Sequence, residues 1–382
     1  MQGLVITDQG LEETAIEELK ELIQAEGKTL EPCIVEFSIK KEQDLCLLAY
    51  KAQSIRQVML LLGKAPCKSD LESVEKAAKK LAKEVDWKVW LKKGASFRCN
   101  AEHTEETDFN SMDLARVVGG EVFDLLKSLK LDPKVSLKNP EVILFALKGE
   151  KQLCLGMDFA GRDLSKRAYK IYHHSSALKG TIAYAAVRFS GFKPNECLVD
   201  PFAGSGIIPI EAALFSSGFS VNHFNKGLAF QKVNKLKVKD KDFDRWEKVR
   251  ELMAVQGSDH LLMHIKASQN NAKIAGVDKW AKFSKGDVEW LDTQFKKQSV
   301  GHIVTHPPEP SQHSSERDIE KVYREFFYQA DFILKKGGNL TVLATKKGLL
   351  LRMAEERKFK VEAEREVWSG KMMYFMLRLK RT

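Results

Sequence analysis

The most informative stretch of this sequence reads Val199-Asp200-Pro201-Phe202-Ala203-Gly204-Ser205-Gly206. It joins an apolar segment at 197–200, which we expect to be a strand, to a helix expected at 207–215. A turn with two glycines between a strand and a helix lets a ligand approach the backbone at the helix N-terminus. Pro209 stands where the dinucleotide fingerprint G-x-G-x-x-G has its third glycine. Taken alone, the stretch is a weak signal: such a turn is more often a plain tight connection between strand and helix, and a nucleotide-like ligand other than a dinucleotide is the alternative.

From about residue 175 onward, helices alternate with nearly continuous apolar strands. Beside the strand at 197–200, strands are expected at 254–258, 281–285, 301–305 and 338–344, with a terminal hairpin made of 360–367 and 372–379. Repeated β–α units predict a mostly parallel sheet with helices on both faces. The predicted fold class is therefore α/β, with a Rossmann-like C-terminal domain.

The residues before 160 predict two small α+β units. In the first, residues 1–62, we expect strands at 4–7 and 33–39 and helices at 10–25 and 44–62. In the second, residues 63–160, we expect helices at 69–83 and 111–128, the latter with Ser111 as its N-cap, and strands at 97–102, 142–147 and 152–158. Residues 161–175 are then a linker, and residues 176–382 form the C-terminal domain.

Composition limits the class of protein. Hydrophobic residues make up 43% of the 382 and charged residues 30%, and no run approaches 18 apolar residues, so no membrane partner is expected. The six cysteines are scattered without a C-x-x-C pair, which disfavours a zinc ribbon or a disulfide framework. The adjacent His173 and His174 have no third ligand nearby in the sequence, so no metal is expected. These features predict a soluble, cytoplasmic protein.

The chain is basic. Lys and Arg number 62 against 52 Asp and Glu, which gives a net charge of +10. A basic excess favours a polyanionic partner, of which nucleic acid is the commonest, and the alternative is a solvated lysine-rich surface.

Two further acidic residues follow expected strands. Asp259 ends the strand at 254–258, and Asp287 follows the strand at 281–285. Because the carboxyl ends of parallel strands meet at one edge of a sheet, Asp200, Asp259 and Asp287 should lie along that edge, with Asp259 placed to read a ribose hydroxyl pair. A single acid at such a position is commonly a helix cap, but the ordered set favours binding.

The order of these motifs resembles a known family. D-P-F-A-G-S-G-x-x-x-x-E at 200–211 is followed by G-S-D at 257–259, G-D at 286–287 and T-H-P-P at 305–308. This order resembles the class I S-adenosylmethionine-dependent RNA methyltransferases that carry a THUMP domain. The run Gly161-Arg162-Asp163-Leu164-Ser165-Lys166-Arg167-Ala168-Tyr169-Lys170 is similar to the G-x-x-L-x-K-R-G-Y-R run that joins the two halves of those enzymes. The resemblance spans nearly the whole chain, with residues 1–62 like the ferredoxin-like companion of a THUMP domain.

The resemblance implies S-adenosylmethionine as cofactor and a role for each matching position. The positions for the methionine part are Asp200, Phe202, Gly204 and Gly206, and those for the ribose and adenine are Asp259, Asp287 and Val288. The archaeal-type members are the most similar, and they methylate the exocyclic N2 amine of a guanosine in the acceptor stem of tRNA. The implied activity is therefore that of a tRNA (guanine-N2-)-methyltransferase.

The sequence departs from the family at the catalytic tetrapeptide. The family has N-P-P-Y where this chain has His306-Pro307-Pro308-Glu309. In the family, the Asn side chain and the first Pro carbonyl accept hydrogen bonds from the amine, and the aromatic ring stacks on the base. By position, the catalytic residues are His306, Pro307 and Pro308, and a neutral His306 can still accept a hydrogen bond. Glu309 cannot stack, and losing the stack weakens base capture by about 1–3 kcal/mol.

Two interpretations of this loop are open. In the first, an active enzyme uses His306 and the Pro307 carbonyl, with aromatic help from Phe202 or Tyr323. In the second, the loop has decayed and leaves an RNA-binding scaffold, or a protein that works with an activating protein subunit. The three acids favour the active enzyme. A nicotinamide dehydrogenase, the rival enzyme class for such a fold, is disfavoured by the missing third glycine.

The basic run at 161–170 predicts an RNA contact. The tRNA-binding residues expected there are Arg162, Lys166, Arg167 and Lys170. Such side chains position RNA through its phosphates without reading its sequence, and the alternative is an exposed charged linker.

Overall fold

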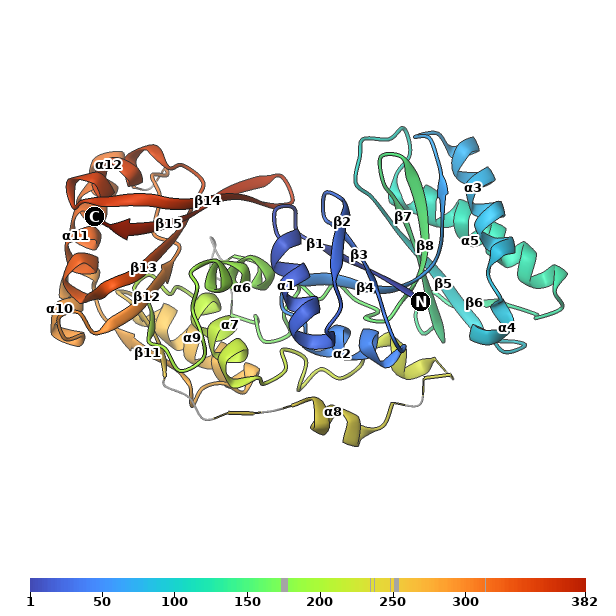
Figure 1. Cartoon of the computed structure of the whole chain (residues 1–382), viewed down its shortest axis with the longest axis horizontal. Coiled ribbons are helices and arrows are strands. Elements are labelled where there is room, and N and C mark those ends of the chain that lie inside the picture. The colour runs from blue at the N-terminus through green and yellow to red at the C-terminus, as the bar shows by residue number, and fades with distance from the viewer. Residues whose placement is uncertain (173–177, 234, 237, 248, 251–253, 313) are drawn as a thin grey trace. The chain divides into compact units, whose positions relative to one another are not determined.

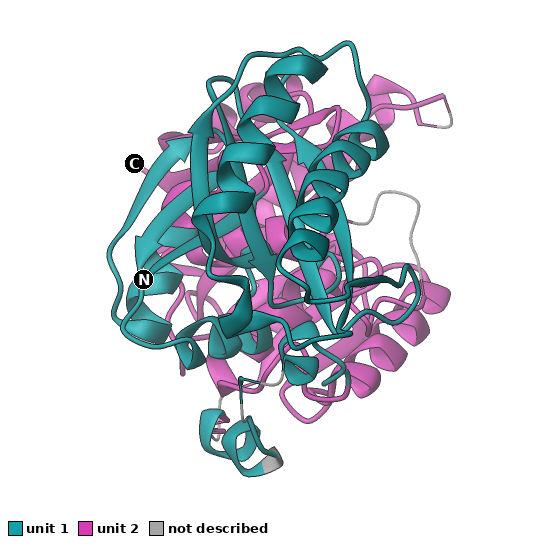
Figure 2. Ribbon diagram, turned by 90° about the vertical axis from the view of Figure 1, so that its right-hand side faces the viewer, with its two compact units in different colours: residues 1–7, 15–164, 225–246 teal, residues 8–14, 165–224, 247–382 magenta. Residues whose placement is uncertain are grey.

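The computed structural model describes residues 1–172, 178–233, 235–236, 238–247, 249–250, 254–312 and 314–382, and these form two compact units (Figures 1 and 2). The N-terminal unit comprises Met1–Thr7, Ala15–Leu164 and Asn225–Trp246. The C-terminal unit comprises Asp8–Thr14, Ser165–Phe224 and Glu247–Thr382. None of the helices in the described part of the chain is long and apolar enough to cross a bilayer.

The N-terminal unit is built on an eight-stranded sheet in the order β2-β3-β1-β4-β8-β7-β5-β6. Its strands are β1 (Gln2–Thr7), β2 (Gly27–Glu31), β3 (Ile34–Ser38), β4 (Ile55–Pro66), β5 (Ser96–His103), β6 (Lys134–Val135), β7 (Val142–Lys148) and β8 (Gln152–Asp158). Its helices are most of α1 (Glu12–Ile23), then α2 (Gln43–Lys51), α3 (Leu71–Glu84), α4 (Trp87–Trp90), α5 (Ser111–Ser128), the 3-10 helix η1 (Ala229–Lys232) and α8 (Asp240–Trp246). The two expected α+β units thus share one sheet. The expected boundary between residues 62 and 63 falls inside β4, and the domain boundaries stay predictions.

The helix expected at 44–62 is wrong in its second half. Helix α2 ends at Lys51, because Ala52 adopts an extended conformation with ψ 135°. Strand β4 then pairs with β1 on one side, where Val58 faces Val5, and with β8 on the other. A strand between two partners and covered on both faces is apolar without alternation, so its pattern resembles that of a buried helix.

The N-cap of α5 also differs from the expectation. Asn110, not Ser111, caps the helix, because its side chain accepts hydrogen bonds from Met112 N at 2.8 Å and Asp113 N at 3.0 Å. Asp113 in turn accepts from the Asn110 backbone N–H, which completes a capping box.

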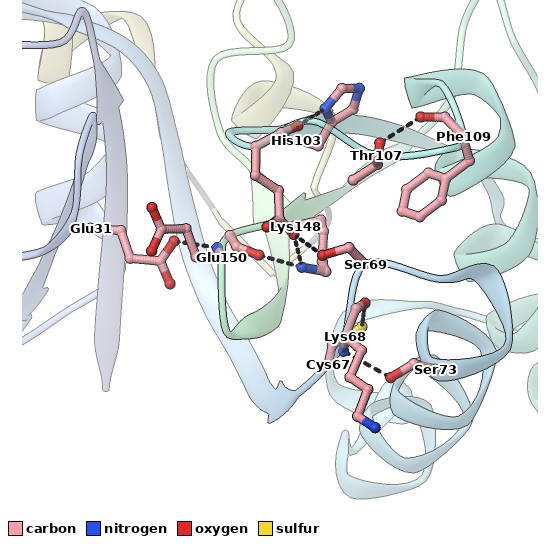
Figure 3. Close-up of polar contacts among 12 residues, drawn as sticks. Glu31, Cys67, Lys68, Ser69, Ser73, His103, Thr107, Phe109, Lys148 and Glu150 are labelled. Atoms are coloured by element: carbon pink, nitrogen blue, oxygen red, sulfur yellow. Dashed lines mark hydrogen bonds and ion pairs between the residues drawn. The ribbon is translucent and has the colours of Figure 1, made fainter.

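A buried ion pair lies at the end of β7 (Figure 3). The Lys148 side chain is fully buried and pairs with Glu105, which also accepts a hydrogen bond from the Ser69 hydroxyl at 2.8 Å. The partners satisfy a charge that would be costly to bury alone, so this lysine is part of the architecture of the unit.

The C-terminal unit is built on a seven-stranded sheet in the order β11-β10-β9-β12-β13-β15-β14. Its strands are β9 (Leu198–Asp200), β10 (Val255–Asp259), β11 (Ala281–Lys285), β12 (Val300–Thr305), β13 (Leu334–Ala344), β14 (Phe359–Ser369) and β15 (Met372–Arg381). Its helices are α6 (Gly180–Phe189), α7 (Ile207–Ser217), α9 (Leu262–Ala275), the 3-10 helix η2 (Val288–Trp290), α10 (Leu291–Gln294), α11 (Glu316–Ile333) and α12 (Gly348–Glu356). The first five strands of the order are parallel, β15 runs antiparallel to β13, and β14 pairs antiparallel with β15. The predicted α/β class with a mostly parallel sheet is confirmed.

Both faces of this sheet are covered, as the sequence predicts. Val304 and Leu343 pack with α6 and α7 in one core cluster, and the neighbouring Ile303 and Val342 pack with α11 and α12 in another. Successive side chains of a strand point to opposite faces, which explains the continuous apolar runs. The order reverses between β9 and β12, so the topological switch point, where such sheets bind ligands, lies at their carboxyl ends.

Candidate functional site

The turn after β9 is shaped by Gly206. Its φ is +82°, and a Cβ there would lie 2.7 Å from Ser268 Cβ and 2.9 Å from Phe283 Cζ. Only glycine fits this left-handed and crowded position. The turn therefore folds back tightly and starts α7 directly behind the edge of the sheet.

A cavity of about 820 Å³ opens at the carboxyl ends of β9, β10, β11 and β12, and it belongs wholly to the C-terminal unit. Nine of the predicted positions line it: Asp200, Phe202, Gly204, Asp259, Asp287, Val288, His306, Pro307 and Pro308. Gly206, the remaining predicted cofactor position, supports the turn from behind. The structure thus brings together residues that are more than 100 positions apart in the sequence.

Asp200 is the buried acid at the switch point. Its Oδ1 accepts hydrogen bonds from the Thr305 hydroxyl at 2.6 Å and from Phe202 N at 3.1 Å. Burial raises the pKa of Asp200 from 3.8 to about 7, and these hydrogen bonds only partly oppose that effect. The charge of Asp259 acts in the same direction as burial and is the smaller cause. A carboxyl with this pKa gains by meeting a cationic ligand, which stabilises the charged form.

Asp259 ties the glycine turn to β10. Its Oδ2 accepts a hydrogen bond from Gly204 N at 3.1 Å, and its Oδ1 accepts one from Leu261 N at 2.9 Å. The same Oδ1 lies 3.0 Å from His264 Nδ1, and His260 is 3.6 Å away. Both histidines line the cavity. Neither histidine was predicted from the sequence, although they lie one and five residues after the predicted Asp259.

Asp287 both caps a helix and lines the cavity. Its Oδ1 accepts a hydrogen bond from Glu289 N at 3.3 Å at the start of η2, so the cap that its sequence position suggested is present. Val288 is buried beside it. An acid next to an apolar wall suits an aromatic ring that carries an amine.

The His306–Glu309 segment is held by three separate elements. The Tyr323 hydroxyl of α11 donates a hydrogen bond to the Pro308 carbonyl at 2.8 Å. The Glu309 carboxylate accepts hydrogen bonds from the backbone N–H and the hydroxyl of Thr345, directly after β13. His306 packs against Tyr374 of β15, with ring centroids 5.7 Å apart and ring planes at 80°. Side chains from α11, from the end of β13 and from β15 therefore hold this segment in place.

The aromatic candidates from the sequence differ in position. Phe202 is half-buried and lines the cavity, with its ring 5.4 Å from Phe326. Tyr323 does not line the cavity, is 1% exposed and directs its hydroxyl to Pro308, so it holds the loop and cannot stack on a base. Tyr374 lines the cavity and was missed, because only the reversal of strand order brings β15 beside β13.

The expectation of an RNA contact is wrong for Arg167. Its side chain is 1% exposed and forms a two-pronged ion pair with the buried Glu211 of α7, with Nε–Oε1 at 2.7 Å and Nη2–Oε2 at 3.1 Å. The Tyr169 hydroxyl donates to the same carboxylate at 2.6 Å. Arg167 is therefore a structural residue that fixes the helix behind the glycine turn.

The other three basic residues of the run differ in exposure. Arg162 donates to the carbonyls of Asn225 and Gly227, and Lys170 donates to the Leu178 carbonyl, so both are partly committed within the protein. Burial lowers the pKa of each. Lys166 is exposed. An RNA contact at these three stays a prediction.

The sequence predicts no metal site. Among the described residues, no three His, Cys, Asp or Glu side chains come together in a way that could hold an ion. His173 and His174 lie outside the described residues.

The donor set of the cavity fits S-adenosylmethionine. The buried Asp200 carboxyl suits a cation, Asp259 suits a hydroxyl pair, and Asp287 with Val288 suits an aminated ring. The three lie in the order in which the parts of that molecule are joined.

Comparisons with known proteins identify the family of this chain. Residues 167–374 match the family described as RMKL-like, methyltransferase domain, and residues 72–158 match the THUMP domain. Over 297 residues the chain is 30% identical to the tRNA (guanine(6)-N2)-methyltransferase of Methanocaldococcus jannaschii. That alignment covers 76% of this chain and 77% of the archaeal protein. Over 380 residues it is 25% identical to the ribosomal RNA large subunit methyltransferase K/L of Vibrio parahaemolyticus. That alignment covers 94% of this chain and 51% of the Vibrio protein.

A solved structure shows the same fold over the full length. TrmN from Thermus thermophilus aligns with 100% of this chain and 99% of its own, with a TM-score of 0.74 and 22% identity. The methyltransferase match spans more than half of the chain, and the archaeal relative spans three quarters of it. The chain therefore belongs to the family of RMKL-like methyltransferases and carries a THUMP domain.

Proposed function

We propose that this protein transfers a methyl group from S-adenosylmethionine to the exocyclic N2 amine of a guanosine in tRNA. The observation that carries the proposal is the single cavity that joins Asp200, Asp259 and Asp287 to the His306–Pro308 segment. The archaeal relative supports the choice of base and of tRNA.

Different parts of the cavity bind different parts of the cofactor. Asp200, with the turn through Phe202 and Gly204, binds the methionine part of the cofactor, Asp259 its ribose, and Asp287 with Val288 its adenine. The sulfonium of the cofactor supplies an already activated methyl group. The protein therefore contributes positioning more than strong acid–base help.

His306 and the Pro307 carbonyl position the amine. A neutral imidazole nitrogen of His306 accepts one N–H of the amine, and the Pro307 carbonyl oxygen accepts the other, which directs the nitrogen lone pair at the methyl carbon. With the cofactor bound, the methyl group would pass from the sulfur to the amine nitrogen, which would gain positive charge. It then releases one proton, which the His306 nitrogen or water takes.

The target base must leave its stack to reach this cavity. Unpairing and extruding a guanine from an acceptor stem costs a few kcal/mol, and phosphate contacts by Lys166 and its basic neighbours hold the flanking RNA.

A cytoplasmic location is part of the proposal, because Cys46 and Cys154 are free thiols of the kind that persist in a reducing compartment.

The Vibrio relative, which matches 94% of the chain, makes large-subunit ribosomal RNA the second candidate substrate. Incubation with methyl-labelled S-adenosylmethionine and either unmodified tRNA or unmodified large-subunit rRNA separates the two. We expect label in the tRNA arm and none with Asp200→Ala. Label in the rRNA arm alone would show that the substrate is ribosomal RNA and not tRNA. RNA binding without label in either arm would instead indicate a scaffold that works with an activating protein subunit.

A further inference from the structure

Tyr374 and His306 form an edge-to-face pair inside the cavity. The two ring centroids are 5.7 Å apart, the ring planes meet at 80°, and both side chains line the cavity wall. Tyr374 is 7% exposed, and burial raises the pKa of its hydroxyl, with a smaller contribution from Glu309. Its hydroxyl therefore stays neutral at physiological pH, and its ring is fixed by the surrounding core.

The residue after Pro308 is not available to contact the base. The Glu309 carboxylate is engaged by the backbone N–H and the hydroxyl of Thr345, which fastens the segment to the end of β13. On the other side, the Tyr323 hydroxyl fastens the Pro308 carbonyl. These two contacts fix the backbone of the segment that carries His306.

An imidazole needs its orientation set more than an amide does. Its acceptor nitrogen has one lone pair, in the ring plane, whereas an amide oxygen has two, so a rotation about the side-chain bonds moves the acceptor away from the amine. Edge-to-face packing on a fixed aromatic ring restrains that rotation. Tyr374, on β15, packs against the His306 ring in this way, although β15 lies outside the sequence motifs of the family.

We propose that Tyr374 is a positioning residue that orients the imidazole of His306 toward the amine of the target base. This inference rests on the proposed methyl transfer, and it explains how a chain with His306 in place of the usual Asn retains an aligned acceptor. The ring of Tyr374, and not its hydroxyl, has this role.

The test is a double-mutant cycle on methyl transfer to tRNA. Tyr374→Phe keeps the ring and should retain kcat within about twofold, whereas Tyr374→Leu should lower kcat about tenfold without changing the KM for S-adenosylmethionine. In a His306→Asn background, which removes the imidazole, the same Tyr374→Leu change should lower kcat less than twofold. Phe375→Leu is the matched control on the neighbouring position of β15, because its side chain points to the opposite face.

A second measurement does not depend on activity. In protein with isotope-labelled histidine, the His306 ring signals, assigned by their loss in His306→Asn, should shift in Tyr374→Leu and stay in place in Tyr374→Phe and Phe375→Leu. Tyr374→Met replaces Tyr374→Leu in both measurements if the latter does not fold.

Three outcomes would overturn the inference: an equal loss of kcat from Tyr374→Leu in both backgrounds, an equal loss in Tyr374→Phe, or unchanged His306 signals in Tyr374→Leu. Absence of methyl transfer by the unmodified protein, with the expected signal shifts present, would refute the proposed function and leave the ring pairing intact.

Discussion

Replacing Arg167 with Met tests whether this residue is structural or contacts RNA. The change removes the charged partner of Glu211 while keeping an unbranched side chain that fills part of the same space. Glu211 is 0% exposed and would lose two charge-assisted hydrogen bonds, of 2.7 and 3.1 Å. Removing one partner of a buried ion pair costs about 3–5 kcal/mol, because the remaining charge stays buried. With a urea m-value of about 3 kcal/mol/M, the unfolding midpoint of the C-terminal unit should fall by roughly 1–1.7 M.

The assay is urea unfolding followed by fluorescence, with Lys166→Met as the matched control. Lys166 is the exposed neighbour, so its replacement should change stability by no more than about 0.5 kcal/mol. Arg167→Met combined with Glu211→Leu should recover much of the loss, because an apolar pair leaves no buried charge. An Arg167→Met variant that unfolds at the midpoint of the unmodified protein, yet loses affinity for tRNA, would refute the structural role.

Three further predictions concern the site. Because the pKa of Asp200 is raised from 3.8 to about 7, the contribution of this group to the free energy of unfolding is most favourable below pH 3.8. Between pH 3.8 and about 7 that contribution falls by about 1.4 kcal/mol per pH unit, and above pH 7 it changes no further. Asp200→Asn should remove that slope in thermal unfolding at several pH values and abolish cofactor binding; an unchanged slope would contradict the assigned burial. His264→Ala should raise the Kd for S-adenosylmethionine about tenfold in calorimetry by freeing Asp259 to rotate, and an unchanged Kd would show that Gly204 suffices to hold it. Thr345→Val removes the hydroxyl that fastens Glu309 and should lower kcat with little effect on cofactor affinity; the reverse pattern would place Glu309 at the cofactor.

The sequence predicts most of the cofactor edge because its signals are local. Asp200 and Asp259 are the last residues of their strands, Asp287 lies two residues after its strand, and parallel strands place such positions along one edge. The α/β class follows from the same alternation. These features need no knowledge of long-range packing.

The errors share a physical cause, which is that burial and partners are set by distant parts of the chain. Arg167 looks like a linker cation until Glu211 is seen to lie against it. Strand β4 has the pattern of a helix because its side chains are buried on both faces of the sheet. Tyr374 enters the cavity only through the antiparallel pairing of β13 with β15, which no local motif announces.

The most direct test of the central claim identifies the product nucleoside. Unmodified tRNA is incubated with the protein and S-adenosylmethionine, digested to nucleosides and analysed by mass spectrometry, with His306→Ala measured in parallel. An active His306–Pro308 segment predicts N2-methylguanosine from the unmodified protein and a rate reduced about 10- to 100-fold in His306→Ala, the loss expected when a hydrogen bond to the reacting amine is removed. Formation of a different methylated nucleoside, or an equal rate in His306→Ala, would contradict the account.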